Sequence, residues 1–207
     1  MIKQIKRNYR HLLRLNINHY NQKRLCNQNF TIISQNCVGG VIYHELGKQF
    51  ASPTINMYMD VPDFIKFISN LKDNVYSDFI EIKSDYSYPC AVIGGGSIKL
   101  HLVHYQSFQE AKEKWIERSK RINWNNLYFI MCDRDGCRDV DIKAFDSLPY
   151  SHKAFLTYKK LPDIKCSVTL PGTQDGNQVI DLCGYPSKFT GLRYLDRFDY
   201  VSFLNEI

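Results

Sequence analysis

The chain has 207 residues, of which 44% are hydrophobic and 23% are charged. This composition excludes disordered and fibrous proteins, and the length is sufficient for one ordinary domain with a sizeable core. No segment approaches the ~18 uninterrupted apolar residues of a membrane-spanning helix, and the start lacks the pattern of a secretory signal, so we expect a cytoplasmic protein. The seven cysteines are an odd number, which favours reduced thiols over a disulfide framework.

The formal net charge of +6 is concentrated at the N-terminus. The first 44 residues carry seven Lys or Arg and no acid, because Glu45 is the first carboxylate. The remainder of the chain is close to neutral. A nucleic-acid-binding protein needs a basic face on its docking element, so the charge pattern argues against a nucleic-acid partner.

Residues 1–24 are predicted to form a basic amphipathic N-terminal helix that is peripheral to a core of residues 25–207. Apolar side chains recur at mostly three- and four-residue spacing between basic ones: Ile2, Ile5, Tyr9, Leu12 and Leu13. Two interpretations stay open. The apolar stripe docks on the domain with the charges solvated, or the helix makes peripheral contact with an anionic membrane surface.

From residue 30 onward, short β-rich runs alternate with helical stretches. Strands are predicted at 30–33, 54–59, 79–82, 90–93, 97–105, 127–131, 153–158 and 166–170. Helices are predicted at 40–49, 63–71, 107–121 and 141–148, and after residue 194. This alternation predicts a single α/β domain, a three-layer α/β/α arrangement with a mixed, mainly parallel sheet.

A candidate nucleophile, Cys37, lies between a predicted strand and a predicted helix. The N–H groups and partial positive charge of a helix start favour a thiolate and lower a thiol pKa. Beside it, Asn36, Gly39 and Gly40 are candidate substrate-binding residues, since glycines permit close approach of a ligand and successive N–H groups can stabilise an oxyanion. A purely structural alternative is a buried thiol next to a tight turn.

A nucleophilic cysteine needs a base, and His104 is the best candidate among the six histidines. His44 is about two helical turns from Cys37, roughly 10 Å, which is too far for a hydrogen bond. His101 and His104 have odd separation on one predicted strand, so they face opposite sides of the sheet. His104 closes that strand, just before a helix cap at Ser107. Alternatively, His104 has a structural role at the edge of the core, where it is hydrogen-bonded to a backbone carbonyl.

A third feature, Cys132-Asp133-Arg134-Asp135-Gly136-Cys137, directly follows the most apolar run of the chain. Asp133 and Asp135 could orient the histidine or hold a divalent cation, and Arg134 is a candidate substrate-binding residue. An ordinary Asp-Gly turn is equally consistent with the pattern. The two cysteines have no second ligand pair with matching spacing, so we predict no zinc cluster. If the strands ending before Cys37, His104 and Asp133 are parallel, these three residues meet at one sheet edge.

Several segments together resemble an uncharacterised bacterial family, a domain of unknown function that is often labelled exopolysaccharide biosynthesis protein. The resemblance covers nearly the whole chain and is carried by residues 30–44, 52–56, 104–108, 111–115, 131–137 and 198–205. It implies a three-layer α/β domain and a place in surface-polysaccharide gene clusters. It does not imply a reaction or any catalytic residue.

These features lead to one preferred function and two alternatives. The preferred one is an enzyme of surface-glycan assembly, an acyl or related group transferase or hydrolase, with Cys37 as nucleophile, His104 as base and Asp133 or Asp135 as the group that orients it. The alternatives are a metal-dependent nucleotide-sugar transferase using the two aspartates, and a non-catalytic accessory protein of glycan assembly. The expected partners are a glycan precursor and a nucleotide-sugar or acyl donor, and the sequence indicates no particular cofactor.

Overall fold

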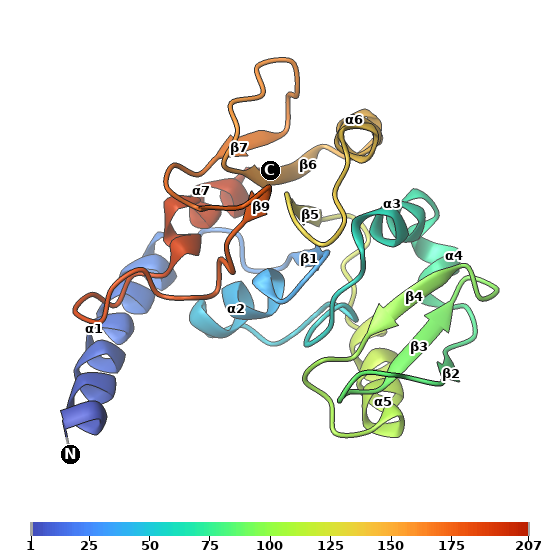
Figure 1. Cartoon of the computed structure of the whole chain (residues 1–207), viewed down its shortest axis with the longest axis horizontal. Coiled ribbons are helices and arrows are strands. Elements are labelled where there is room, and N and C mark those ends of the chain that lie inside the picture. Colours follow the sequence, from blue (N-terminus) through green and yellow to red (C-terminus); the bar gives the residue numbers. More distant parts are fainter. Residues whose placement is uncertain (1, 207) are drawn as a thin grey trace.

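The computed structural model describes the backbone of residues 2–206 and the side chains of residues 9–206 (Figure 1). Its helices are α1 (Ile2–Arg24), α2 (Val38–Glu45), α3 (Val61–Ser69), α4 (Leu71–Val75), α5 (Phe108–Ser119), α6 (Asp139–Ser147) and α7 (Tyr200–Asn205), with a 3₁₀ turn at Tyr194–Arg197. Its strands are β1 (Thr31–Ser34), β2 (Ile80–Ile82), β3 (Cys90–Ile93), β4 (Ile98–His101), β5 (Leu127–Cys132), β6 (His152–Thr157), β7 (Ser167–Thr169), β8 (Gln174–Asp175) and β9 (Gln178–Val179).

A four-stranded parallel sheet in the order β1-β5-β6-β7 forms the centre of the fold. Its register aligns Ile33 with Phe129 and Phe129 with Lys153. The apolar run of β5 is almost fully buried, as expected for a strand with neighbours on both edges and layers on both faces. The structure therefore confirms the α/β fold class with a mainly parallel sheet.

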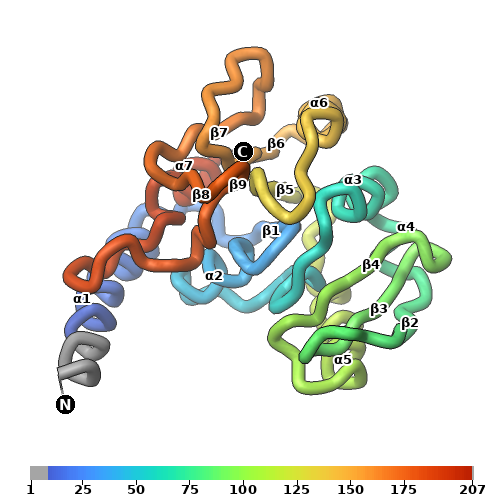
Figure 2. The backbone as a smooth tube through the Cα atoms, in the orientation of Figure 1, coloured from blue at the N-terminus to red at the C-terminus, as the bar shows by residue number. Residues whose placement is uncertain are grey.

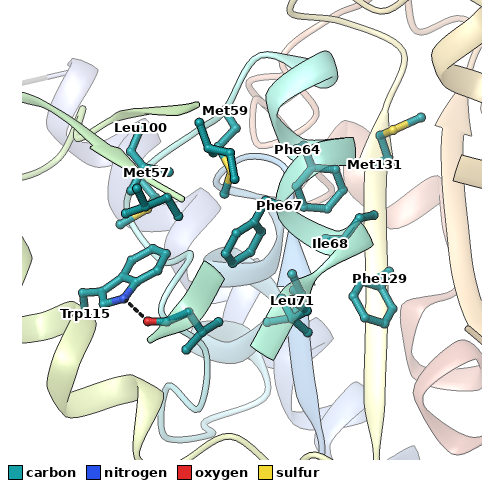
Figure 3. Packing of buried hydrophobic residues seen from close by; sticks show 14 of the residues in the cluster. Met57, Met59, Phe64, Phe67, Ile68, Leu71, Leu100, Trp115, Phe129 and Met131 are labelled. Atoms are coloured by element: carbon teal, nitrogen blue, oxygen red, sulfur yellow. Dashed lines mark hydrogen bonds between the residues drawn. The ribbon is translucent and has the colours of Figure 1, made fainter. Parts of the chain in front are cut away.

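Two hydrophobic cores lie on opposite faces of this sheet, because successive side chains of a strand point to opposite sides. Phe129 and Met131 of β5 enter the first core, which includes residues of α3, α5 and α6, whereas Tyr128 and Ile130 enter the second core, with residues of α2 and α7. In Figure 3 the first core fills the space between β5 and α3. Its Trp115 ring is anchored by a hydrogen bond from Nε1 to the carbonyl of Val75 at 2.9 Å.

The antiparallel strands differ from the expected single mixed sheet, because they form sheets of their own. Strands β2, β3 and β4 make a separate three-stranded sheet, and β8 pairs with β9 in a short hairpin that the sequence did not indicate. Residues 54–59, predicted as a strand, instead form turns and one isolated bridge from Tyr58 to His101. This segment crosses from the parallel sheet to the antiparallel one, so its extended appearance reflects a connection.

Helix α1 docks on the domain through buried polar side chains. Of the apolar stripe expected from the sequence, Ile2 and Ile5 lie outside the side chains that the structure describes. Arg14 is 5% exposed and forms ion pairs with Glu45 and with Asp196, the latter at 2.5 Å. Asn21 donates to the hydroxyl of Tyr200 at 2.9 Å. Leu13 and Ile17 of the helix are half-buried. Four other large apolar side chains of the helix face solvent: Tyr9, Leu12, Leu15 and Tyr20. A helix with a buried ion-pair network is part of the fold and is not peripheral to it.

The C-terminal segment returns to α1 after β9, as the orange-to-red part of the tube in Figure 2 shows. The carbonyl of Gly191 accepts a hydrogen bond from Arg14 at 3.2 Å, and the Tyr185 ring lies against the guanidinium groups of both Arg10 and Arg193. The segment then enters the second core through α7. Within residues 2–206, no helix combines the length and apolar content that crossing a membrane requires.

Candidate functional site

The loops after β1 and β5 emerge together at the carboxyl edge of the parallel sheet. The backbone N–H of Met59 donates to the carbonyl of Gln35, and that of Val61 donates to the carbonyl of Asp135, both at 3.0 Å. The Gln35 side chain joins the two loops directly, because its Nε2 donates to Asp135 Oδ2 at 2.9 Å. Open α/β sheets bind ligands at this edge. Of the three strands expected to end together at this edge, those before Cys37 and Asp133 do so, whereas the strand before His104 belongs to the antiparallel sheet.

A cavity of about 510 Å³, called the larger cavity below, opens between these loops. It brings together five of the residues predicted from the sequence: Asn36, Cys37, His104, Arg134 and Asp135. Gly40 lines a second cavity of about 290 Å³, called the smaller cavity, and Asp133 and Gly39 line neither of the two. Both cavities are lined by Cys37, Val41 and His104, so they adjoin at the candidate nucleophile.

The Cys37 thiol is less acidic than an ordinary thiol, in contrast to the expectation of a lowered pKa. Burial raises its pKa to about 11, and the negative charges of Asp181 and Asp135 act in the same direction, while Arg134 acts against them. The free-energy cost of removing a thiolate from water exceeds the stabilisation that the N-terminus of the eight-residue helix α2 provides. Cys37 is therefore a neutral thiol at pH 7 and requires a base before it can act as a nucleophile.

The N–H groups at the start of α2 are already used by neighbouring side chains. Asn36 Oδ1 accepts from the N–H of Val38, and Ser34 Oγ accepts from the N–H of Gly39, both at 3.2 Å. A β-carbon at Gly39 would lie 2.5 Å from Ser34 Oγ, so glycine is needed there for packing. Consequently Gly39 holds the helix against β1, and its N–H is not available as an oxyanion donor.

His104 reaches the larger cavity by a different route from the one predicted. Strand β4 ends at His101, so the predicted extent of this strand through Tyr105 is wrong. The strand belongs to the antiparallel sheet, so the condition that it runs parallel to β1 is not met. His104 lies in the turn that follows, where its N–H donates to the carbonyl of Asn56 at 3.3 Å. This contact fixes the turn against the connection after α2. As a result, an exposed imidazole lines the same cavity as Cys37.

Asp133 is placed away from the cavity, although it follows β5 as predicted. Its carboxylate is 3% exposed, accepts from Thr157 Oγ1 at 2.7 Å and pairs with Lys159 Nζ at 3.3 Å. It therefore ties β5 to the end of β6 instead of orienting His104. Asp135 has other partners, Gln35 and Arg134. Across residues 9–206, no group of three His, Cys, Asp or Glu side chains is arranged to hold a metal ion.

Several lining residues escaped the sequence analysis, and the polar ones among them are Asn56, Tyr58, Asp181, Cys183 and Arg193. The last three come from the C-terminal segment, which has no strand or helix pattern around them. Asp181 Oδ1 accepts from the N–H of Cys183 at 3.0 Å, and Arg193 Nε donates to Glu45 Oε1 at 2.6 Å. A polar segment without periodicity offers no local signal for this placement, which depends on long-range packing.

Comparisons with known proteins place the chain in a family. Residues 8–205 match the family described as a domain of unknown function, DUF1919. The chain is also similar to an uncharacterized protein of Haemophilus influenzae (strain Rd), with 38% identity over 189 residues, which cover 91% of this chain and 90% of that protein. A match to the family over almost the whole chain, together with a relative of nearly the same extent, means that the protein belongs to the DUF1919 family.

Proposed function

We propose that the protein is an acyl or related group transferase of surface-glycan assembly that uses Cys37 as its nucleophile and His104 as its base. The observation that carries the proposal is that a thiol and an imidazole from different sheets line one cavity with a guanidinium, that of Arg134. A cysteine, a base and a cationic group around one space are the parts that thioester chemistry needs. The glycan setting rests on the family resemblance alone.

In the proposed reaction, Cys37 Sγ attacks the carbonyl carbon of an acyl donor while His104 takes the thiol proton. The carbon–leaving-group bond then breaks, and His104 returns the proton to the leaving group, which yields a thioester on Cys37. An acceptor hydroxyl attacks this thioester and gives its proton to His104, which passes it to the departing sulfur. Arg134 stabilises the negative charge on the carbonyl oxygen, since its Nε is held by Asp135 at 3.2 Å and its other nitrogens remain for the ligand.

A base is essential here because the resting thiol is protonated. A thiol pKa of about 11 leaves only a trace of thiolate at pH 7, so attack must be coupled to proton removal. His104 is exposed at the cavity and can accept that proton. Positioned general bases contribute about 10²- to 10⁴-fold to such steps.

The proposal is tested by capturing the acyl-enzyme with p-nitrophenyl acetate and locating the acetyl group by peptide mass spectrometry. We expect acetylation of Cys37, its loss in Cys37→Ser, and an acylation rate about 10²-fold lower in His104→Gln. Cys183→Ser removes a second thiol of the same cavity and His19→Gln an exposed histidine of α1, and both should acylate like the wild type. Acetylation spread over several cysteines, or an unaltered rate in His104→Gln, would refute the proposal.

A further inference from the structure

The two adjoining cavities differ in their charged groups. The larger cavity is lined by the carboxylates of Asp135 and Asp181 and by the guanidinium of Arg134, which pairs with Asp135. In the smaller cavity, His44, His104 and Arg193 present nitrogen donors. Among the residues that the structure describes, no Asp or Glu lines the smaller cavity. Cys37 stands at the junction of the two.

The smaller cavity is suited to an anion with several oxygens. Arg193 is fixed by Glu45 and by the carbonyl of Cys183, which use its Nε and Nη1. Its Nη2 has no hydrogen-bond partner among the described residues, and its guanidinium lies 4.3 Å from the Tyr185 ring centroid. The guanidinium is therefore held in place with one donor group left for a ligand. Guanidinium and imidazole groups that converge from separate elements favour a phosphate, whose oxygens accept from several directions.

The carboxylates of the larger cavity are suited to a ligand that donates hydrogen bonds, while Arg134 in the same cavity remains for the acyl carbonyl oxygen. Ionised carboxylates only accept, and hydroxyl groups of a sugar are the neutral donors that match them. Asp135 is oriented by Gln35, and Asp181 by the N–H of Cys183 at 3.0 Å, so both carboxylates are held in place. Tyr58 adds an aromatic wall to the same cavity. Taken together, the two cavities fall within the range of about 300–1,000 Å³ that is common for small-molecule sites.

We infer that the substrate is a phosphorylated sugar, with its hydroxyl groups in the larger cavity and its phosphate in the smaller one. This inference rests on the proposed function, because it makes the sugar the acceptor whose hydroxyl meets the thioester on Cys37. The sugar then lies beside the nucleophile, and the phosphate lies beyond it toward His44 and Arg193. A neutral sugar or free phosphate would fill only one of the two cavities.

Binding is tested by protection of Cys37 from iodoacetamide at pH 9, measured by peptide mass spectrometry, with glucose 1-phosphate as the probe. We expect saturating glucose 1-phosphate to slow alkylation of Cys37 at least fivefold, whereas glucose, inorganic phosphate and glucuronate at the same concentration have less than a twofold effect. Protection of equal strength by glucose or by glucuronate would refute the phosphate assignment. Absence of protection by glucose 1-phosphate would refute the inference as a whole.

The variant that isolates the smaller cavity is His44→Gln. His44 is exposed on α2, so its replacement should leave the fold intact. The concentration of glucose 1-phosphate that gives half-protection should rise at least fivefold in His44→Gln and stay unchanged in the matched control His19→Gln. Equal half-protection concentrations in wild type and His44→Gln would place the phosphate elsewhere and overturn the inference.

Failure of this inference and failure of the proposed function give different experimental results. In Cys37→Ser, which cannot form the thioester, titration calorimetry should still show binding of glucose 1-phosphate. If the wild type binds the sugar phosphate but forms no acyl-enzyme, the catalytic proposal fails and this inference stands. If the acyl-enzyme forms without any binding of the sugar phosphate, this inference fails and the catalytic proposal stands.

Discussion

Cys37 illustrates how far a single residue can be interpreted from its place in the sequence. Its position between a strand and a helix was predicted correctly, and so was its proximity to Arg134 and Asp135. The sign of its pKa shift was wrong, because the sequence does not show that the thiol is buried, and burial is the main cause of the raised pKa. Nor does it show that Asp181 approaches from a distant segment. Local sequence thus predicts the location of a group better than its electrostatic environment.

We expect alkylation of Cys37 to be slow at neutral pH and to accelerate about tenfold per pH unit up to roughly pH 11, because only the thiolate reacts. Asp181→Asn removes a negative charge that raises this pKa, so the whole profile should shift to lower pH. Iodoacetamide labelling followed by mass spectrometry between pH 7 and 11 measures both effects. Asp175→Asn, in the exposed β8–β9 hairpin, is the matched control and should leave the profile unchanged. A plateau below pH 8.5 would contradict this account.

Among the secondary-structure elements, the helices and the parallel strands were largely predictable, because their signals are local. The hydrophobic run of β5 and the Ser107 cap, which accepts from the N–H of Glu110 at 3.2 Å, both lie where the sequence placed them. Elements whose form depends on distant partners were not predictable. Residues 54–59 have strand-like composition but serve as a connection, and β4 stops at His101, earlier than the sequence suggested.

Helix α1 shows the same limitation, since the sequence left open whether its apolar stripe docks on the domain or contacts a membrane surface. The partners that hold the helix are Glu45 and Asp196, two acids with little exposure that lie far from Arg14 in sequence. A buried carboxylate needs a cationic partner, which the polar face of the helix supplies. A truncation that removes α1 would leave Glu45 with Arg193 as its cationic partner and without Arg14.

We therefore expect Arg14→Met to lower the free energy of unfolding by about 3–5 kcal/mol, the cost typical of removing one partner from a buried ion pair. The matched control is Arg24→Met on the same helix. Its ion pair with Asp199 is partly solvated, so its loss should cost less than about 1 kcal/mol. Equilibrium unfolding in urea, followed by circular dichroism, compares the two variants. Equal small losses would show that α1 contributes little to the stability of the fold.

On the scale of the whole molecule, β5 and β6 lie inside the parallel sheet with a core on each face. We expect their backbone amides to exchange with deuterium only through global unfolding, because local opening would disrupt both cores at once. Amides of β2, where Ile80 is exposed, and of the β8–β9 hairpin should exchange earlier. Native-state hydrogen exchange measured by NMR gives this order. Slowest exchange in β2–β4 would instead make the antiparallel sheet the most stable part of the protein.

The return of the C-terminal segment to α1 has a consequence for how damage outside the site reaches the cavities. Arg193 lines the smaller cavity and shares Glu45 with Arg14 of α1. The carbonyl of Gly191, two residues earlier, accepts a hydrogen bond from Arg14. Proteolytic cleavage that removes Arg14 would therefore release an anchor of the cavity wall, although no described residue of α1 lines either cavity.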